Sequence, residues 1–204
     1  RAVMTGVTQC AGRMSENAME LLGTRYVEVE AHSGARDTGA GYFNHKSWQG
    51  KWYYWSRHSE PDPLGKYDDF IKTTGYGEGG GLCGWNCRHM WFPVIPGLDE
   101  PTYTKEQLDN IDPPPFEWKG KEYTAYAARQ KQRQYERTMR YYKRQLIAND
   151  AAGYEDEYNL YKKKLSDMSA EYREFSKKAK LPLQMERARV QGFGQREAAK
   201  ARRK

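Results

Sequence analysis

The chain has 204 residues, of which 38% are hydrophobic and 30% are charged, and its mean hydropathy of −1.04 is strongly polar. No apolar run approaches the roughly 20 residues that a membrane-spanning helix needs, so we expect no membrane contact. The aromatic fraction of 14% argues against a fully disordered chain, because rings can bury surface. The sequence begins with Arg1 and shows no signal peptide, so we expect a piece of a longer protein.

The net charge of +7 is unevenly distributed along the chain. Residues 1–120 carry a net charge of −4, whereas residues 121–204 carry +11. Three consecutive prolines at 113–115 favour an extended segment between the two regions. The sequence therefore predicts an α+β domain over residues 1–112, a proline-rich linker over 113–119, a basic helical hairpin over 120–194 and a disordered basic tail over 195–204.

The first region predicts one helix followed by two strands. Apolar residues recur on one helix face over residues 3–22, and Gly23 follows as a stop signal. Residues 26–32 alternate between apolar and polar side chains, and residues 51–55 are rich in aromatic rings, and both patterns are typical of strands. A glycine-rich loop follows over residues 74–85. These elements predict a small α+β domain rich in glycine and tryptophan.

A group of cysteines and histidines is the strongest candidate for chemistry in this region. Cys83, Cys87 and His89 follow the glycine loop closely, with His45 earlier in the chain. We predict that these four residues form a structural cluster that anchors the glycine loop, with no catalysis and no cofactor. Zinc is an alternative, with His45 or His32 as the fourth ligand, although the Cys-x3-Cys-x-His spacing lacks the paired knuckles of well-formed zinc modules. A cysteine nucleophile with a histidine base is a further alternative.

The second region contains two apolar ladders with alternating steps of four and three residues, which is the spacing of one helix face. The first ladder consists of Ala128, Gln132, Tyr135, Met139, Tyr142 and Leu146, and the second consists of Tyr161, Leu165, Met168, Tyr172, Phe175 and Ala179. A short turn at residues 149–153 separates them. The pattern predicts two helices that fold back as an antiparallel hairpin and pack along these ladders.

Basic side chains occupy the helix faces outside the ladders and the end of the tail. Their excess of one sign predicts an anionic partner, either nucleic acid or an acidic protein surface, and a merely solvated face is the alternative. The expected contact residues are Arg129, Lys131, Arg133, Arg137, Arg140, Lys143, Arg144, Lys162, Lys163, Lys164, Arg202, Arg203 and Lys204.

Several strings in this sequence occur in the order of a known family. They include His-x-x-Trp-Gln-Gly-Lys at 45–51, Thr-Gly-Tyr-Gly at 74–77 and Gly-Leu-Cys-Gly-Trp-Asn-Cys-Arg-His at 81–89. The chain resembles the phage minor capsid protein 2 family, which is similar to the Mu protein F type of head-morphogenesis proteins of tailed phages. The resemblance carries over six motif residues, Arg36, Trp48, Gln49, Gly50, Asn86 and Arg88. This chain departs from the family pattern by an insertion between Arg36 and His45.

The resemblance implies a minor structural protein of the virion, located in the phage head and made in the cytoplasm of a bacterial host. It implies a role in head assembly or genome delivery near the portal. The expected partners are the portal protein, the major capsid protein or both, with packaged DNA as a further partner. The alternative is a Cys/His-dependent hydrolase or a toxin-like effector carried in the head. We find no helix-turn-helix or zinc-finger pattern, so sequence-specific DNA reading is not expected.

Overall fold

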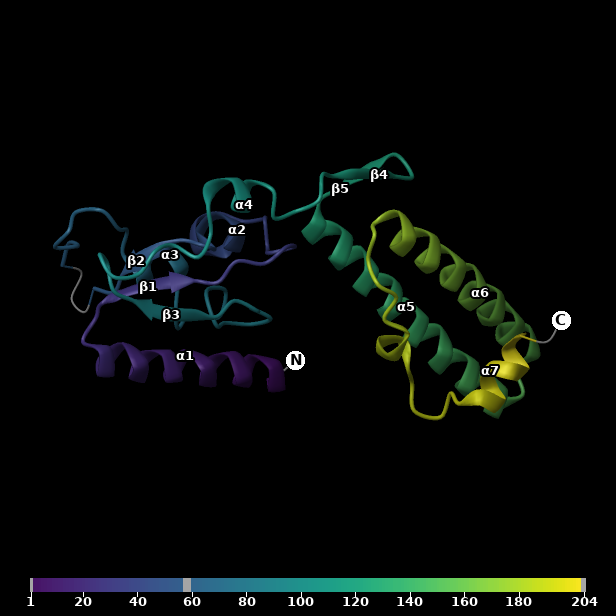
Figure 1. The fold of residues 1–204 in the computed structure, drawn as a ribbon. Coiled ribbons are helices and arrows are strands. Elements are labelled where there is room, and N and C mark those ends of the chain that lie inside the picture. Colours follow the sequence, from purple (N-terminus) through teal and green to yellow (C-terminus); the bar gives the residue numbers. More distant parts are fainter. Residues whose placement is uncertain (1, 57–59, 203–204) are drawn as a thin grey trace. The chain divides into compact units, whose positions relative to one another are not determined.

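The computed structural model describes residues 2–56 and 60–202 and divides the chain into two compact units (Figure 1). Unit 1 comprises Arg1–Pro113, and unit 2 comprises Pro114–Lys204. Both units combine helices with a small antiparallel sheet, which confirms the predicted α+β class. None of the described helices is long and apolar enough to cross a membrane.

Unit 1 contains a three-stranded antiparallel sheet in the order β2-β1-β3. Its strands are β1 (Tyr26–Val29), β2 (Trp52–Tyr54) and β3 (Trp91–Val94). The sequence predicts β1 and β2 within slightly longer segments but misses β3. The four residues of β3 do not alternate between apolar and polar, and they include Pro93, which disfavours a strand assignment. The proline is tolerated because β3 lies at the edge of the sheet.

Helix α1 (Ala2–Leu22) forms as predicted and packs against β3 (Figure 1). Among the described residues its buried positions are Thr8, Gly12 and Met19, and Ser15 Oγ donates to the carbonyl oxygen of Trp91 at 2.6 Å. The apolar face that predicts the helix is largely exposed to solvent, at Val3, Val7, Met14, Leu21 and Leu22. The hydrophobic period thus predicts this helix but not the face that covers the sheet.

Short helices complete unit 1, namely η1 (Gly41–Phe43), α2 (His45–Trp48), α3 (Phe70–Thr74) and α4 (Lys105–Asp109). Asp69 caps α3 by accepting a hydrogen bond from the Lys72 N–H. The core around the sheet contains four aromatic rings, three sulfur side chains and three aliphatic side chains. Its buried members are Met19, Val27, Val29, Trp48, Tyr53, Phe70, Leu82, Cys83, Cys87 and Trp91.

Unit 2 is dominated by α5 (Ala125–Ala152) and α6 (Glu155–Lys178), which pack side by side and are joined by a tight turn (Figure 1). Thr124 caps the start of α5, and Gly153 ends it with a left-handed φ of 74°. The residues of both ladders form the core of this unit, either buried or half-buried. The polar ladder residue Gln132 keeps its hydrogen bonds there, because its side chain donates to Ser176 Oγ at 3.1 Å.

A second sheet precedes α5 and consists of β4 (Phe116–Trp118) and β5 (Lys121–Tyr123). The rings of Phe116, Trp118 and Tyr123 surround Phe175 of α6 at centroid distances of 5.4–5.7 Å. Residues 116–118, which the sequence assigns to the linker, therefore form a strand that packs against the helices. Their ring contacts with residue 175 explain why this segment is ordered rather than an open connection.

The predicted disorder of the tail is wrong for its described part. After η2 (Met185–Ala188), the chain forms helix α7 (Gln195–Arg202). The Glu197 carboxylate accepts a hydrogen bond from the Gly194 N–H at 2.8 Å, and Lys200 forms an ion pair with Asp150 and lies 5.4 Å from the ring of Tyr158. These α5 and α6 partners are remote in sequence, so the tail's own composition does not reveal them. The predicted contact residues Arg203 and Lys204 lie outside the described residues.

Candidate functional site: a buried histidine and cysteine cluster

The glycine-rich loop folds back on itself through a series of tight turns. Residues 78, 81, 84 and 87 each donate a backbone hydrogen bond to the residue three positions earlier. A Cβ on Gly81 would lie 2.1 Å from the carbonyl oxygen of Gly75, and one on Gly84 would lie 2.5 Å from that of Glu78. Only glycine permits this close approach of backbone to backbone. These turns therefore hold the residues that follow the loop in a fixed position.

This loop and helix α2 bring three of the four predicted cluster residues together. His45 begins α2, whereas Cys87 and His89 lie between the loop and β3. One ligand atom from each residue lies within 4.8 Å of the other two, and all three side chains are buried. The Cys87 Sγ is 3.6 Å from His89 Nδ1. Cys83 lies outside this triad, and its Sγ instead faces the carbonyl oxygen of His89 at 3.9 Å.

Hydrogen bonds fix the proton positions on both imidazoles. Gln49 Oε1 accepts a hydrogen bond from the backbone N–H of His32 at 3.1 Å and lies 3.0 Å from His89 Nε2. Because an amide oxygen can only accept, His89 Nε2 carries the proton and donates it to Gln49. His45 Nε2 lies 2.9 Å from the carbonyl oxygen of Gly80, which can only accept, so it also carries the proton. The lone pair of each ring is therefore on Nδ1.

The motif residues implied by the family resemblance surround this triad. Despite the insertion between them, Arg36 and His45 converge on the same carbonyl oxygen of Gly80, at 3.2 and 2.9 Å. Trp48 is buried, and the centroid of its ring lies 4.6 Å from that of the His45 ring and 4.8 Å from that of the His89 ring. These contacts make the resemblance motif a packing shell around the histidines.

The remaining motif residues shape the backbone near the cluster. Gly50 has a φ of 67°, and a Cβ there would lie 2.4 Å from the Leu108 side chain. Asn86 has a left-handed φ of 59° and is exposed, which turns the chain between the loop and Cys87. Arg88 is exposed as well. Gly50 and Asn86 therefore act on the site through the backbone conformations that they adopt.

Burial controls the ionisation of the cluster. It lowers the pKa of His45 to about 4 and also lowers the pKa of His89, so both rings are neutral at neutral pH. Burial raises the pKa of Cys83 to about 12 and also raises the pKa of Cys87. Both thiols therefore stay protonated unless a cation replaces the proton.

The predicted alternative of a cysteine nucleophile has a partial geometric basis. Cys87, His89 and Gln49 are connected in the order of a nucleophile, a base and an orienting amide. Reactive cysteines, however, are partly exposed and have a lowered pKa. Cys87 is only 4% exposed and His89 only 1% exposed, and the thiol pKa is raised. The arrangement therefore favours a structural or metal-binding role over attack on a substrate.

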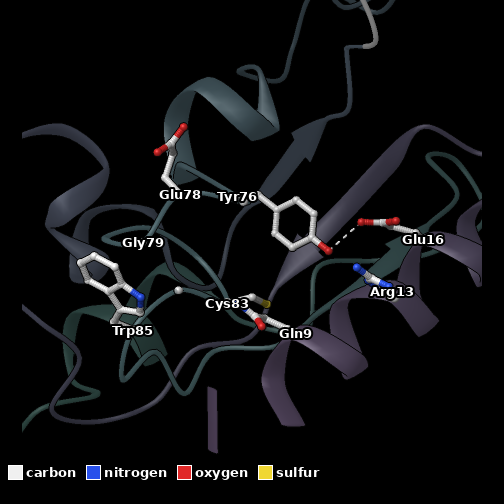
Figure 2. A pocket seen from close by; sticks show the side chains of 10 residues that line it. Gln9, Arg13, Glu16, Tyr76, Glu78, Gly79, Cys83 and Trp85 are labelled. Atoms are coloured by element: carbon white, nitrogen blue, oxygen red, sulfur yellow. Dashed lines mark hydrogen bonds between the residues drawn. The ribbon is translucent and has the colours of Figure 1, made fainter. Parts of the chain in front are cut away.

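An open pocket of about 460 Å³ lies between α1 and the glycine loop (Figure 2). Tyr76 points across it and donates a hydrogen bond to Glu16 at 2.7 Å, with Arg13 beside them (Figure 2). On the opposite wall the indole of Trp85 is 71% exposed. Sequence reasoning missed this pocket, because nothing in the pattern of α1 indicates that residue 13 or 16 faces the loop.

The predicted anion-contact residues of unit 2 fall into two groups. Five arginines lie along one face of α5 away from the buried ladder, at Arg129, Arg133, Arg137, Arg140 and Arg144. Arg137 and Arg144 are exposed, whereas Arg140 donates to the carbonyl oxygen of Arg187. Lys143 is half-buried and donates to the carbonyl oxygen of Ala188 at 2.7 Å.

The other predicted contact residues lie in more mixed surroundings. Lys131 and Lys164 lie over the rings of Tyr135 and Tyr161, at 4.7 and 5.2 Å from the ring centroids. The remaining described members of this group are Lys162, which is half-buried, and Lys163 and Arg202, which are exposed.

Comparison with family models identifies the class to which this fold and motif shell belong. The model of the family described as phage minor capsid protein 2 matches residues 1–177, which include the whole cluster and nearly all of both long helices. The chain therefore belongs to the phage minor capsid protein 2 family, and its class is that of a structural component of the phage virion. A search of curated proteins gave no match, and neither did a search of solved structures.

Proposed function

We propose that this minor capsid protein acts in head assembly or genome delivery near the portal, and that the arginine row of α5 contacts packaged DNA. The row comprises Arg129, Arg133, Arg137, Arg140 and Arg144. Family membership supports the virion role, and the row is the observation that supports contact with a polyanion.

The spacing of the row suits a linear polyanion. Successive arginines are four, four, three and four residues apart, so they stay on one side of the helix. At 1.5 Å per residue the row extends over about 22 Å, long enough to meet several phosphates. Between Arg129 and Arg144, helix α5 carries a single acidic residue, Glu136, and the side chain of Glu136 is buried.

The two long helices differ in charge, which makes α5 the more specific candidate. Helix α5 contains seven basic and two acidic residues, whereas α6 contains six of each. A charge that only kept the hairpin in solution would not need to be concentrated on one helix. The segment after α6 adds Arg187 and Arg189, both exposed, beside residues 140 and 143 of α5.

A salt titration of the full chain on a random-sequence duplex tests this proposal. Counterion release predicts that the logarithm of the affinity falls linearly with the logarithm of salt concentration, with a slope of roughly −3 to −6. Replacing Arg129, Arg137 and Arg144 by Gln is expected to make the slope less steep by about 2 to 3, since each lost phosphate contact contributes about 0.9.

The matched control replaces Arg173, Lys177 and Lys178 of α6 by Gln. It removes the same charge from exposed positions of the neighbouring helix. We expect its slope to stay close to that of the parent. Equal weakening by both variants would mean that net charge alone drives binding. Absence of binding at low salt would leave an acidic capsid or portal surface as the partner of the row.

A further inference from the structure

The triad of His45, Cys87 and His89 has the geometry of a metal site. A tetrahedral zinc ion with bonds of about 2.3 Å to sulfur and about 2.1 Å to nitrogen separates these two ligand atoms by about 3.6 Å. The distance between Cys87 Sγ and His89 Nδ1 is 3.6 Å. The ligand atom of His45 lies within 4.8 Å of both, so a small local movement completes the third contact.

The hydrogen bonds around the triad match those that orient metal-binding histidines. Such histidines usually donate their second ring N–H to a carbonyl or carboxylate, which directs the lone pair of the other nitrogen at the metal. His89 donates to the side-chain oxygen of Gln49, and His45 donates to the carbonyl oxygen of Gly80. Gln49 is itself held by the backbone N–H of His32. Both rings are thus preset as neutral ligands.

The surroundings also supply the ligand chemistry that zinc prefers. Neutral imidazole and thiolate are its usual nitrogen and sulfur ligands. The three side chains are 1–4% exposed, so a bound ion would be shielded from competing solvent. One thiol proton cannot satisfy two imidazole lone pairs at once, whereas one cation contacts both rings and the sulfur.

We propose that His45, Cys87 and His89 bind a zinc ion that anchors the glycine loop to helix α2. On binding, the thiol of Cys87 loses its proton to solvent and forms the sulfur–zinc bond, while each histidine contributes a ring nitrogen. The fourth position is taken by water or another small ligand, because among the described residues neither Cys83 nor His32 joins the group of ligand atoms. This site is independent of the proposed DNA contact, which uses unit 2.

Metal analysis of the full chain, purified without chelator and without a histidine tag, tests the proposal. We expect about one zinc per chain, and removal with a chelator is expected to lower the melting temperature by several degrees, restored by zinc. Cobalt substitution provides a second measurement on the unmodified protein, since a thiolate ligand gives a charge-transfer band in the near ultraviolet.

Variants separate the triad from the other thiols. Cys87→Ser and His89→Gln are expected to lose the metal, whereas Cys10→Ser, at an exposed cysteine of α1, and Cys83→Ser are expected to retain it. In the parent, a thiol reagent should modify Cys10 at once and Cys87 only after chelation. These results together support the site.

Clear outcomes overturn the proposal. Less than about a fifth of an equivalent of zinc after reconstitution with excess zinc would reject it. So would retention of zinc by Cys87→Ser. Rapid reaction of Cys87 with the thiol reagent before chelation would instead support the nucleophile interpretation. Because the cobalt spectrum is measured on the unmodified chain, a variant that fails to fold does not block the test.

Discussion

Replacing Leu165 by Asp tests the packing of α6 on α5. Leu165 is 9% exposed and belongs to the core of unit 2. Losing a buried leucine side chain costs about 2 kcal/mol or more in transfer free energy, and placing a carboxylate in its position adds a desolvation penalty. We therefore expect the free energy of unfolding of unit 2 to fall by about 3–5 kcal/mol.

The matched control is Leu160→Asp, the same change five residues earlier on α6. Leu160 is 49% exposed, so its replacement is expected to change the free energy of unfolding by less than about 0.5 kcal/mol. Urea unfolding followed by far-ultraviolet circular dichroism reports mainly on the long helices of unit 2. Tryptophan fluorescence reports mainly on unit 1, which contains five of the six tryptophans.

The expected result is an earlier circular dichroism transition for Leu165→Asp and an unchanged one for Leu160→Asp. If both variants unfold at the urea concentration of the parent, α5 and α6 do not pack along the ladder that contains Leu165. If both unfold equally early, the negative charge itself rather than burial is responsible, and the assignment of the buried face is wrong.

Three further changes have defined expectations. Gly81→Ala should lower the stability of unit 1 by at least about 2 kcal/mol in urea unfolding, since its Cβ meets the carbonyl oxygen of Gly75; a neutral effect would contradict the loop structure. Although burial opposes its ionisation, hydrogen bonds lower the pKa of Asp62, so its stabilising effect is present above the unfolded pKa of about 3.9 and is lost as the pH falls through the folded pKa. Asp62→Asn should therefore flatten the acid side of the stability–pH profile, and an unchanged profile would argue against those bonds. Lys200→Gln should increase amide hydrogen exchange in α7, because it removes the ion pair with Asp150, and unchanged exchange would mean that other contacts order the tail.

The sequence predicts the elements whose signals are local. The four-and-three ladders predict α5 and α6, because the same spacing that forms one helix face also forms the core between the helices. Thr124 and Gly153 bound α5 through local chemistry, because the threonine side chain caps the first turn and glycine tolerates the left-handed conformation that ends the helix. Helix α7 is ordered by Asp150 and Tyr158, which are distant in sequence, so its own polar composition gives no such signal.

The candidate site shows the same limit. The resemblance singles out Gln49, but only the structure shows that its side-chain oxygen joins His32 to His89. Spacing alone groups Cys83 with Cys87, yet Cys83 Sγ faces the carbonyl oxygen of His89 whereas Cys87 Sγ faces the ring nitrogen of that residue. Which atom of a neighbour a thiol faces is not readable from the separation of the cysteines in the chain.

We propose that the chain, a structural component of the phage virion, lies in the head beside the portal with α5 facing DNA. A reconstruction of the whole particle by electron cryomicroscopy, without imposed icosahedral symmetry, tests it most directly. We predict density for this fold at the portal vertex, with the arginine row of α5 directed at the packaged genome. Density for the chain only in the tail, or its absence from mature particles by mass spectrometry, would contradict the account.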